Sequence, residues 1–430
     1  WGSGGTPSRK EPSYYNGNVP WIKTGDLGPK VIHESSEYIT ELGIQNSNAK
    51  YFSKGSVAIA MYGATIGKTS ILGINSTTNQ ACAVGTPIDK ITFSEFVYYL
   101  LSNERDNFIA KGKGGAQPNI SQTLIKDHEV MLPPLAEQKV IADKLDTLLA
   151  QVETTKARLE RIPEILKTFR QSVLAAAASG KLTEEWRAEG FTLANIADFQ
   201  NGFAFKSGWF EANGEYQVVK LGNIRDGNLA LENSPAYLKK AIAEEYLRFV
   251  PQTGDTLLSM TGTRFKKDYG FGCIIKGESN LLVNQRVGRL IPNRELVLPE
   301  YLNIFVRSEL FRVQFFKGET GGVNQGNVGS KHIMGIKITL PNIDQQTKIV
   351  SRVEDLFSFA DNIDQKGNAA LKRVNNLTQS ILAKAFRGEL TADWRAENPD
   401  FITGENSAES LLKKITAEQQ KLRANKTRKR

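Results

Sequence analysis

Two segments of the chain carry apolar residues at alternating spacings of four and three. This period of about 3.5 residues predicts a long helix with one apolar stripe, as in a coiled coil. The first stripe contains Ile141, Leu145, Leu148, Val152, Leu159, Leu166 and Phe169. The second contains Ile349, Val353, Leu356, Val374, Leu377 and Ile381. Because one such helix alone would leave its stripe in water, we expect the two helices to pack on each other as an antiparallel coiled coil.

The stripes lie inside a direct repeat. Residues 132–189 begin LPPLAEQKVIADKLDTLL and end QSVLAAAASGKLTEEWRAE, whereas residues 340–397 begin LPNIDQQTKIVSRVEDLF and end QSILAKAFRGELTADWRAE. The copies align without a gap at an offset of 208 residues (340 − 132), which indicates a duplicated structural unit. Pro163 predicts a kink or local break in the first helix. Gly180 and Gly388 predict matching helix C-terminal ends.

The remaining sequence is typical of two globular domains. Short apolar runs between Gly-, Pro- and Ser-rich turns predict strands, and Phe93–Phe108 and Pro299–Phe316 predict helices. We therefore expect an α/β (α+β) fold with a pseudo-two-fold internal repeat. Its predicted parts are a first domain 1–131, a helical spacer 132–189, a second domain 190–339, a second spacer 340–397 and a basic tail 398–430.

The two globular domains follow one plan with little identity. The matching segments are GNVPWIKTGDL (17–27) with GEYQVVKLGNI (214–224), and TNQ (78–80) with VNQ (283–285). A short strand, Glu129–Leu132, is expected to lead into the first long helix. The segment GFTLANIADF (190–199) has no counterpart before Trp1, so the first domain is either truncated or opens differently.

Composition adds a hint about the partner. The chain has 430 residues, of which 40% are hydrophobic and 23% charged, as in an ordinary multi-domain protein. Its net charge of +9 favours a polyanionic partner. We expect the last ten residues, KLRANKTRKR, to be disordered because they are so strongly basic. Cys82 and Cys273 show no metal-type spacing, and no apolar run is long enough to span a membrane, so we expect a cytoplasmic protein.

The sequence contains no convincing catalytic motif. In YGATIGKTS, three residues separate Gly63 from Gly67, whereas a phosphate-binding loop requires four. His33, His128 and His332 occupy non-equivalent places without metal-ligand spacing, so they are best explained as structural or surface residues. Paired carboxylates followed by lysine, as in a nuclease, are not apparent. We therefore predict no catalytic residues, no bound metal and no catalysis by this chain alone.

Recognition chemistry is the better candidate. Glycine-rich loops follow the helix of each domain, and Lys, Asn and Gln in such loops can neutralise phosphates and bond base edges. The candidate DNA-binding residues of the first domain are Lys111, Lys113, Gln117 and Asn119. Those of the second domain are Arg264, Lys266, Lys267, Asn284, Gln285, Arg286, Lys317, Asn324, Gln325 and Asn327. Any one of them could equally be a solvated turn residue.

The repeated segments resemble a known family. LPPLAEQKVIADKLDTLLAQV, NNLTQSILAKAFRGELTADWRAENPD and GENSAESLL are similar to the specificity subunit of type I restriction-modification enzymes, closest to the type IA group. The resemblance is very specific in 132–189 and 340–410 and extends to the layout of the whole chain. It implies two target-recognition domains that read the halves of a split site in double-stranded DNA.

The resemblance also implies partners. The helices would dock two methyltransferase subunits, and restriction subunits would join the full complex. S-adenosylmethionine, ATP and Mg would belong to those partners, which methylate adenine at N6 and cleave DNA. The first stripe spans residues 141–173, roughly 50 Å of helix, which suits holding two domains about one DNA turn apart, roughly 34–36 Å.

Two other interpretations stay open at the level of sequence. The chain could be a coiled-coil scaffold that holds two protein-binding domains, in which case it would show no salt-dependent affinity for DNA. It could also be a fragment of a single-chain restriction and methylation enzyme. The complete repeat at 340–397 argues against the fragment.

Overall fold

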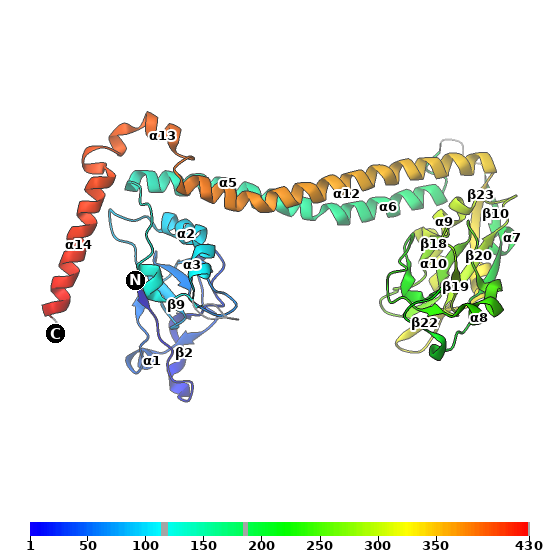
Figure 1. Cartoon of the computed structure of the whole chain (residues 1–430), viewed down its shortest axis with the longest axis horizontal. Helices are drawn as coiled ribbons and strands as arrows, with labels where there is room; N and C mark the ends of the chain where they lie inside the picture. Colours follow the sequence, from blue (N-terminus) through cyan, green and yellow to red (C-terminus); the bar gives the residue numbers. More distant parts are fainter. Residues whose placement is uncertain (113–118, 184–187, 429–430) are drawn as a thin grey trace. The chain divides into compact units, whose positions relative to one another are not determined.

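A computed structural model describes residues 1–112, 119–183 and 188–428. Its contacts divide the chain into two compact units. Unit 1 contains Trp1–Leu159 with Ala370–Arg430, and unit 2 contains Glu160–Ala369. Each unit combines one globular domain with parts of the long helices (Figure 1).

The repeat forms the long helices, as predicted. The first copy forms α5 (Leu135–Glu160) and α6 (Ile162–Ala178), and the second forms the single helix α12 (Ile343–Phe386). The expected break is confirmed: Arg161 separates α5 from α6, since Pro163 lacks a backbone N–H and fits the first turn of a helix.

Both copies end in the same way. Gly180 has φ +81° and Gly388 has φ +75°, the left-handed conformation that terminates helices. The backbone N–H of Lys181 donates to the Ala176 carbonyl at 2.9 Å, and that of Glu389 to the Lys384 carbonyl at 3.0 Å. These are the bonds of a Schellman motif, so the predicted helix ends are confirmed.

The helices pack antiparallel within unit 2. Ile162 at the start of α6 faces Gly367, and Arg170 bonds Asp361 at 2.6 Å. Further along α6, Val173 joins one apolar cluster with Val353 near the start of α12. Positions therefore rise on one helix as they fall on the other. Stripe residues that are buried or half-buried in this unit are Ile349, Val353, Leu356, Leu166 and Phe169.

In unit 1, α5 packs against the C-terminal part of α12. Ile141 and Leu145 share an apolar cluster with Leu382 and Ala385, and the Lys144 ammonium donates to the Leu390 carbonyl at 2.8 Å. The stripe residues Leu148, Val152, Leu159, Val374 and Ile381 are also buried or half-buried.

One stripe assignment was wrong. Leu377 is 43% exposed. Leu382 and Ala385, in contrast, are buried in one cluster with residues of α5, and Thr378 is half-buried. A helix of 3.6 residues per turn drifts away from a strict 3.5-residue pattern. Over this length the drift moves the buried stripe by one position beyond Val374.

Unit 1 builds its globular domain from two sheets and a helical cover. Its strands are β1 (Gly2–Ser3), β2 (Tyr15–Ile22), β3 (Val31–Ile32), β4 (Tyr38–Ile39), β5 (Tyr51–Phe52), β6 (Val57–Ala60), β7 (Thr69–Leu72), β8 (Ser76–Thr78) and β9 (Cys82–Gly85). Its other helices are α1 (Glu41–Gln45), α2 (Ser94–Asn103), α3 (Arg105–Lys111), α4 (Gln122–Lys126), α13 (Ala392–Glu397) and α14 (Ala408–Arg428). The strand orders are β1-β9-β6-β7-β3 and β4-β2-β8-β5.

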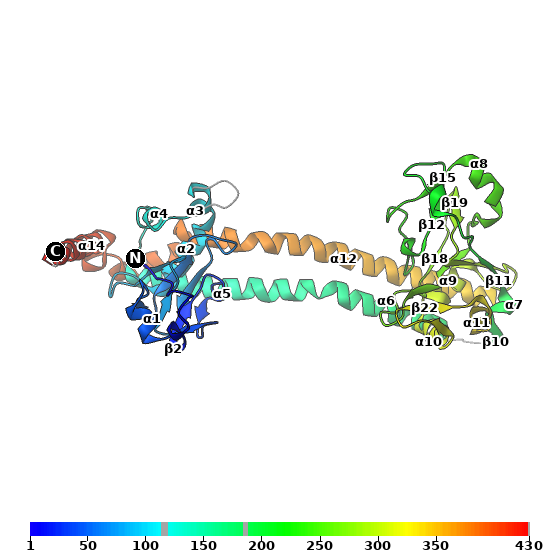
Figure 2. The ribbon, with the colours of Figure 1, turned by 90° about the horizontal axis from the view of Figure 1, so that it is seen from below.

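Unit 2 repeats this plan with additions. Its strands are β10 (Ala188–Thr192), β11 (Ala197–Asn201), β12 (Tyr216–Val219), β13 (Ile224–Arg225), β14 (Asn228–Leu229), β15 (Tyr237–Leu238), β16 (Thr256–Ser259), β17 (Thr261–Thr263), β18 (Gly272–Ile274), β19 (Leu281–Val283), β20 (Val287–Pro292), β21 (Glu319–Gly321), β22 (Gln325–Val328) and β23 (Lys337–Pro341). Its other helices are α7 (Leu193–Ile196), α8 (Lys240–Ala243), α9 (Pro299–Arg307), α10 (Glu309–Lys317) and α11 (Ser330–Met334). The principal strand orders are β11-β20-β16-β18, β15-β12-β19 and β17-β22-β21. Figure 2 shows β15, β12, β19 and α8 on one side of the domain.

The two domains share topology and register. β2 pairs parallel with β8 and antiparallel with β4, just as β12 pairs parallel with β19 and antiparallel with β15. Beyond each parallel pair, the N–H of Asn79 donates to the Ile22 carbonyl and that of Asn284 to the Val219 carbonyl, both at 3.0 Å. The predicted repeat of the domains, including the match of TNQ with VNQ, therefore holds in three dimensions, and the fold has the expected α+β character.

Two local expectations were wrong. Glu129–Leu132 forms no strand, whereas the equivalent β23 pairs with β10, and no strand among the described residues of unit 1 offers this segment a comparable partner. Residues 421–428 of the basic end are helical instead of disordered, because α14 continues to Arg428, and residues 429 and 430 lie outside the described residues. The Ala, Glu, Gln, Lys and Leu residues of α14 are strong helix formers, and their propensity outweighs the charge repulsion.

Each domain shares its core with the long helices. In unit 1, Phe96 and Leu100 of α2 join Ile141 and Leu145 of α5. In unit 2, Phe305 of α9 belongs to the same cluster as residues of α6, α10 and α12. Burying one such side chain contributes about 1.5–3 kcal/mol, so the shared clusters hold each domain to its helices.

A buried glutamine fixes each of these junctions. Gln138 and Gln346 are fully buried and lie at equivalent positions of the repeat. The Gln138 Oε1 accepts from the Phe93 N–H at 2.9 Å, and its Nε2 donates to the carbonyls of Ile91 and Pro133 at 2.9 Å.

Gln346 makes the same three bonds in unit 2. Its Oε1 accepts from the Leu298 N–H at 2.7 Å, and its Nε2 donates to the carbonyls of Leu296 at 2.9 Å and Pro341 at 2.8 Å. Each amide therefore joins the chain before a domain helix to the start of a long helix.

We predict that Gln346→Leu lowers the free energy of unfolding by about 2–4 kcal/mol, because it leaves buried backbone groups without partners. The matched control is Gln151→Leu, since Gln151 is exposed on α5 and should cost far less. Urea denaturation measures both. Equal losses in the two variants would refute the role of the buried amide.

Candidate nucleic-acid interface

Two adjoining hollows in unit 2 form one groove, which we call the amide groove. Their volumes are about 890 Å³ and 420 Å³. They share Leu221, Gly222, Arg225 and Arg286. The further polar residues that line the groove are Ser207, Lys220, Asn223, Glu232, Asn233, Ser234, Thr261, Thr263, Asp268, Asn284, Gln285, Asn324 and Gln325.

One wall is the turn that follows β12. Asn223 is fully buried and its Nδ2 donates to the carbonyls of Ala230 at 2.8 Å and Asn233 at 2.9 Å. Its Oδ1 accepts from the Lys220 N–H at 2.8 Å. Asp26 makes the same bond to the Lys23 N–H in unit 1, also at 2.8 Å. The turn is therefore part of the common frame, and in unit 2 it places Lys220 at the groove.

The hairpin β13–β14 carries Arg225, and its next residue anchors it. The Asp226 carboxylate accepts from Gln171 of α6 at 2.8 Å and from Arg307 of α9 at 3.0 Å. The Arg307 guanidinium also lies 5.4 Å from the ring centroid of Phe357 on α12. Arg225 is thus positioned by contacts that reach both long helices.

A second wall is the turn Asn284–Arg286 after β19. Its backbone is fixed by the bond from the Asn284 N–H to Val219 and by one from the Met260 N–H to the Arg286 carbonyl, both 3.0 Å. The side chains of Gln285 and Arg286 are exposed. A rigid turn thus presents an amide and a guanidinium to the groove.

The third wall is the sheet β17-β22-β21. Buried Tyr269 donates its hydroxyl to Glu319, which also accepts from the Arg264 guanidinium at 3.1 Å. Burial, and then the bond to Glu319, raise the pKa of Tyr269, so the phenol stays protonated and can donate. This arrangement supports the strand end that carries Asn324 and Gln325.

The groove gathers about half of the candidates predicted for this domain. Asn284, Gln285, Arg286, Asn324 and Gln325 line it. The others do not. Arg264 pairs with Glu319, Asn327 accepts from the Thr261 hydroxyl at 2.9 Å, and Lys267 lies 5.1 Å from the Phe316 ring centroid, while Lys266 and Lys317 are exposed elsewhere.

In the first domain, the loop candidates remain predictions. Lys111 and Asn119 are exposed, and Lys113 and Gln117 lie outside the described residues. Sequence reasoning missed Lys220 and Arg225 in the second domain. The match of GNVPWIKTGDL with GEYQVVKLGNI was a signal for Lys220, since it aligns with Lys23, whereas Arg225 has no such sign.

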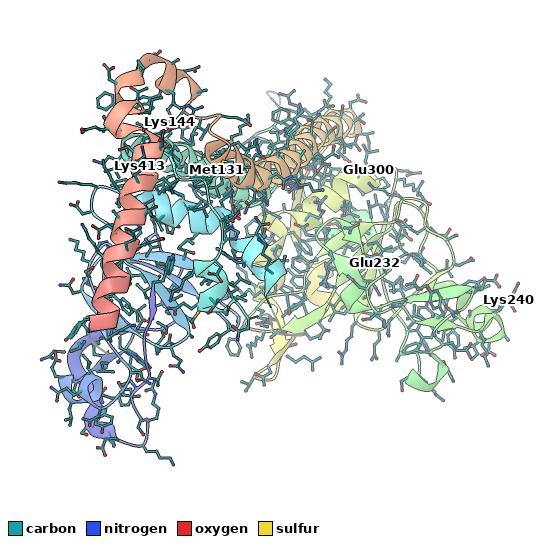
Figure 3. All side chains as sticks on the ribbon, turned by 60° about the vertical axis from the view of Figure 1, so that its left-hand side comes forward. Met131, Lys144, Glu232, Lys240, Glu300 and Lys413 are labelled. Carbon is teal, nitrogen blue, oxygen red and sulfur yellow. The ribbon has the colours of Figure 1, made fainter. Side chains whose placement is uncertain are left out.

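The groove's chemistry suits a polar, anionic ligand that also offers hydrogen-bonding edges. Lys220, Arg225 and Arg286 face two carboxylates, Glu232 and Asp268, so its charge is only slightly positive. The Asp268 carboxylate already accepts a hydrogen bond within the domain, from the Thr263 N–H, and this bond holds the pKa of its carboxyl below the ordinary value. Glu232 is an exposed residue of the domain (Figure 3).

Other chemistry finds little support in the part of the chain that the structure describes. These residues contain no group of three His, Cys, Asp or Glu side chains placed to hold a metal ion. His128 bonds Glu104 at 2.9 Å and His332 bonds the Gln314 carbonyl at 2.9 Å, so both have structural partners. Among the described helices, none is both long and apolar enough to span a bilayer.

Fold and groove define a class of protein: two globular domains of one topology, each packed on repeated long helices, with a polar groove in the second domain. The family model "Type I restriction modification DNA specificity domain" matches residues 2–164 and 184–373. The chain belongs to this family of specificity subunits.

Its relatives are consistent with that assignment. The EcoKI specificity subunit of Escherichia coli (strain K12) is 41% identical over 353 residues, which cover 78% of this chain and 74% of the relative. The EcoBI specificity subunit of Escherichia coli is 38% identical over 364 residues, covering 79% and 74%. These relatives are of the type IA group, in agreement with the resemblance of the repeated segments.

Solved structures agree on the fold. The HsdS subunit from Thermoanaerobacter tengcongensis aligns with a TM-score of 0.57 at 16% identity, covering 90% of this chain and 95% of that one. A chain from a study of assembly and conformational transition of the type I R-M system aligns with a TM-score of 0.64 at 15% identity and the same coverage.

We predict that Glu319→Gln loosens the third wall of the groove. The change keeps the side chain's size but removes the charge that Arg264 and Tyr269 bond, which should destabilise the hairpin by about 1 kcal/mol. Hydrogen exchange at Gln325–Val328 should become several times faster. Glu232→Gln, an exposed carboxylate outside the hairpin, is the control; unchanged exchange in Glu319→Gln would contradict the prediction.

Proposed function

We propose that this chain reads a bipartite site in double-stranded DNA, one half with each globular domain. The observation that carries the proposal is the amide groove, where five predicted recognition residues converge with Lys220 and Arg225. Amides and guanidinium groups bond base edges, and cations contact phosphates. DNA offers both kinds of group at every step.

The internal repeat supports two different half-sites. The domains share a frame, since Asn79 and Asn284 make equivalent backbone bonds. The residues on that frame differ: exposed Arg286 of the second domain, for example, aligns with buried Ala81 of the first. One frame with two surfaces suits a protein that binds two unlike sequences.

The proposal extends to the partners. Two methyltransferase subunits dock on the long helices, where Ile165 and Phe359 leave large apolar side chains exposed in unit 2. Restriction subunits join through them. S-adenosylmethionine, ATP and Mg serve these partners, so adenine-N6 methylation and cleavage are activities of a cytoplasmic complex and not of this chain by itself.

The test is methylation by the reconstituted complex. We expect the chain, assembled with its cognate methyltransferase subunit, to place N6-methyladenine in a split motif with a fixed gap. Replacing residues 190–339 with the same domain of a relative should change one half of the motif only. The scaffold interpretation would instead be supported by two results together. A stable complex with an active partner would not methylate DNA, and its affinity for DNA would not depend on salt concentration.

Charge removal in the groove gives a second prediction. Arg286→Ala should weaken DNA binding about tenfold and reduce the salt slope by about one, if Arg286 contacts a phosphate, or relax specificity at one base, if it contacts a base edge. Lys240→Ala is the matched control, because Lys240 lies on α8, does not line the groove and pairs with Glu215 at 3.7 Å (Figure 3). Binding isotherms at several salt concentrations measure both. Equal effects of the two changes would contradict a role for the groove.

A further inference from the structure

Two large apolar side chains stand in solvent at one end of the sheet β17-β22-β21. Phe265 is 78% exposed and Val323 is 75% exposed. Thr263 of β17 pairs with Gln325 of β22, and each apolar residue lies two positions beyond this last pair. They therefore sit at the same end of the sheet, next to Asn324 and Thr263, which line the amide groove.

Single exposed apolar residues are ordinary, so exposure alone decides nothing. The loop that carries Phe265 is, however, rigidly built. The Lys267 N–H donates to the Thr263 carbonyl at 2.9 Å, and the Asp268 carboxylate accepts from the Thr263 N–H at 2.6 Å. These two bonds close the loop on itself and leave Phe265 at its apex.

Arg312 of α10 bonds the backbone of this loop. Its guanidinium donates to the carbonyls of Lys267 at 3.1 Å and of Tyr269 and Gly270 at 3.0 Å. Lys267 has φ +47°, a conformation that non-glycine residues adopt at a cost. Several hydrogen bonds thus hold a strained loop in place, and the apex of this loop is an aromatic ring exposed to water.

The surrounding charge matches a nucleic acid. Lys266 follows Phe265 and is exposed, and the groove beside the loop carries Arg225 and Arg286. Aromatic rings and apolar wedges next to cations are the means by which proteins stack on bases or separate base pairs.

The loop of the first domain that is equivalent to the one carrying Phe265 lacks an exposed apex of this kind. This loop runs from Met61 to Gly67, whereas that of the second domain runs from Met260 to Gly270, four residues more (270 − 260 against 67 − 61). Ile66 in the shorter loop packs on the domain core, and Tyr62 is only 36% exposed. The exposed apex is therefore an addition to the common frame.

We propose that Phe265, with Val323 beside it, is a wedge that enters between base pairs and unstacks one step of the half-site bound by the second domain. This rests on the proposed function, that the domain reads DNA. The wedge adds specificity through deformability, because flexible pyrimidine–purine steps open at the lowest cost. The equivalent loop of the first domain, from Met61 to Gly67, supplies no such wedge to the first half-site.

The experiment uses the complete methyltransferase complex and its mapped target, with 2-aminopurine placed at successive positions of both half-sites. We expect fluorescence to rise at one step of the second half-site, apart from the methylated adenine, which is itself expected to leave the stack when modified. Phe265→Ala should abolish the rise at that step, keep the signal at the methylated adenine and weaken binding by roughly tenfold.

The controls separate the wedge from general damage. Leu247→Ala removes another exposed apolar side chain of the same domain, outside the groove, and should behave like the unmodified chain. Phe265→Leu should preserve part of the rise, because an apolar side chain can still act as a wedge.

Two results would overturn the wedge while leaving DNA recognition intact: an unchanged signal in Phe265→Ala, or tight specific binding with no unstacking except at the methylated adenine. Absence of specific binding by the unmodified complex would instead refute the proposed function itself.

Discussion

The structure depends on a buried amide that occurs twice. Gln138 and Gln346 each join a backbone N–H before a domain helix to two carbonyls, one before that helix and one at the start of a long helix. A buried amide is stable only when its donors and acceptor are all satisfied, so this bonding pattern admits one geometry. The apolar clusters then pack around a junction whose direction is already set. Without the amides, apolar packing alone would join helix and domain, and three buried backbone groups at each junction would lose their partners.

The long helices could be predicted because their information is local. A 3.5-residue period, a proline and two glycines determine the helices, their break at Arg161 and their ends. The error at Leu377 arises because the period was extended rigidly, while a real helix drifts against it. The segment Glu129–Leu132 failed for a different reason. A strand is defined by its neighbour, and apolar alternation within one segment cannot reveal whether that neighbour exists.

The groove was only half accessible to sequence reasoning, for the same reason. Asn284, Gln285, Arg286, Asn324 and Gln325 were found because amides and glycines mark exposed recognition loops. Arg264 and Asn327 have the same character, yet their side chains bond Glu319 and Thr261 inside the domain. Arg225 went unnoticed because its position depends on Asp226, whose partners Gln171 and Arg307 are 55 and 81 residues away in the chain. Long-range hydrogen bonds decide which polar residues are free, and no local pattern encodes them.

The contacts of Asp226 also bear on how recognition and assembly are connected. Gln171 belongs to α6, and Arg307 touches Phe357 of α12, so the hairpin that presents Arg225 is held by the same helices on which partner subunits are proposed to dock. In unit 1 a different link joins the domain to the helix, since Lys30 of the domain and Asp146 of α5 form an ion pair to which Tyr99 also donates. In each unit, a charged side chain of the domain therefore bonds a polar side chain of its own stretch of helix. In unit 2, these contacts give a movement of the helices a direct route to the hairpin that carries Arg225, which is proposed to touch DNA.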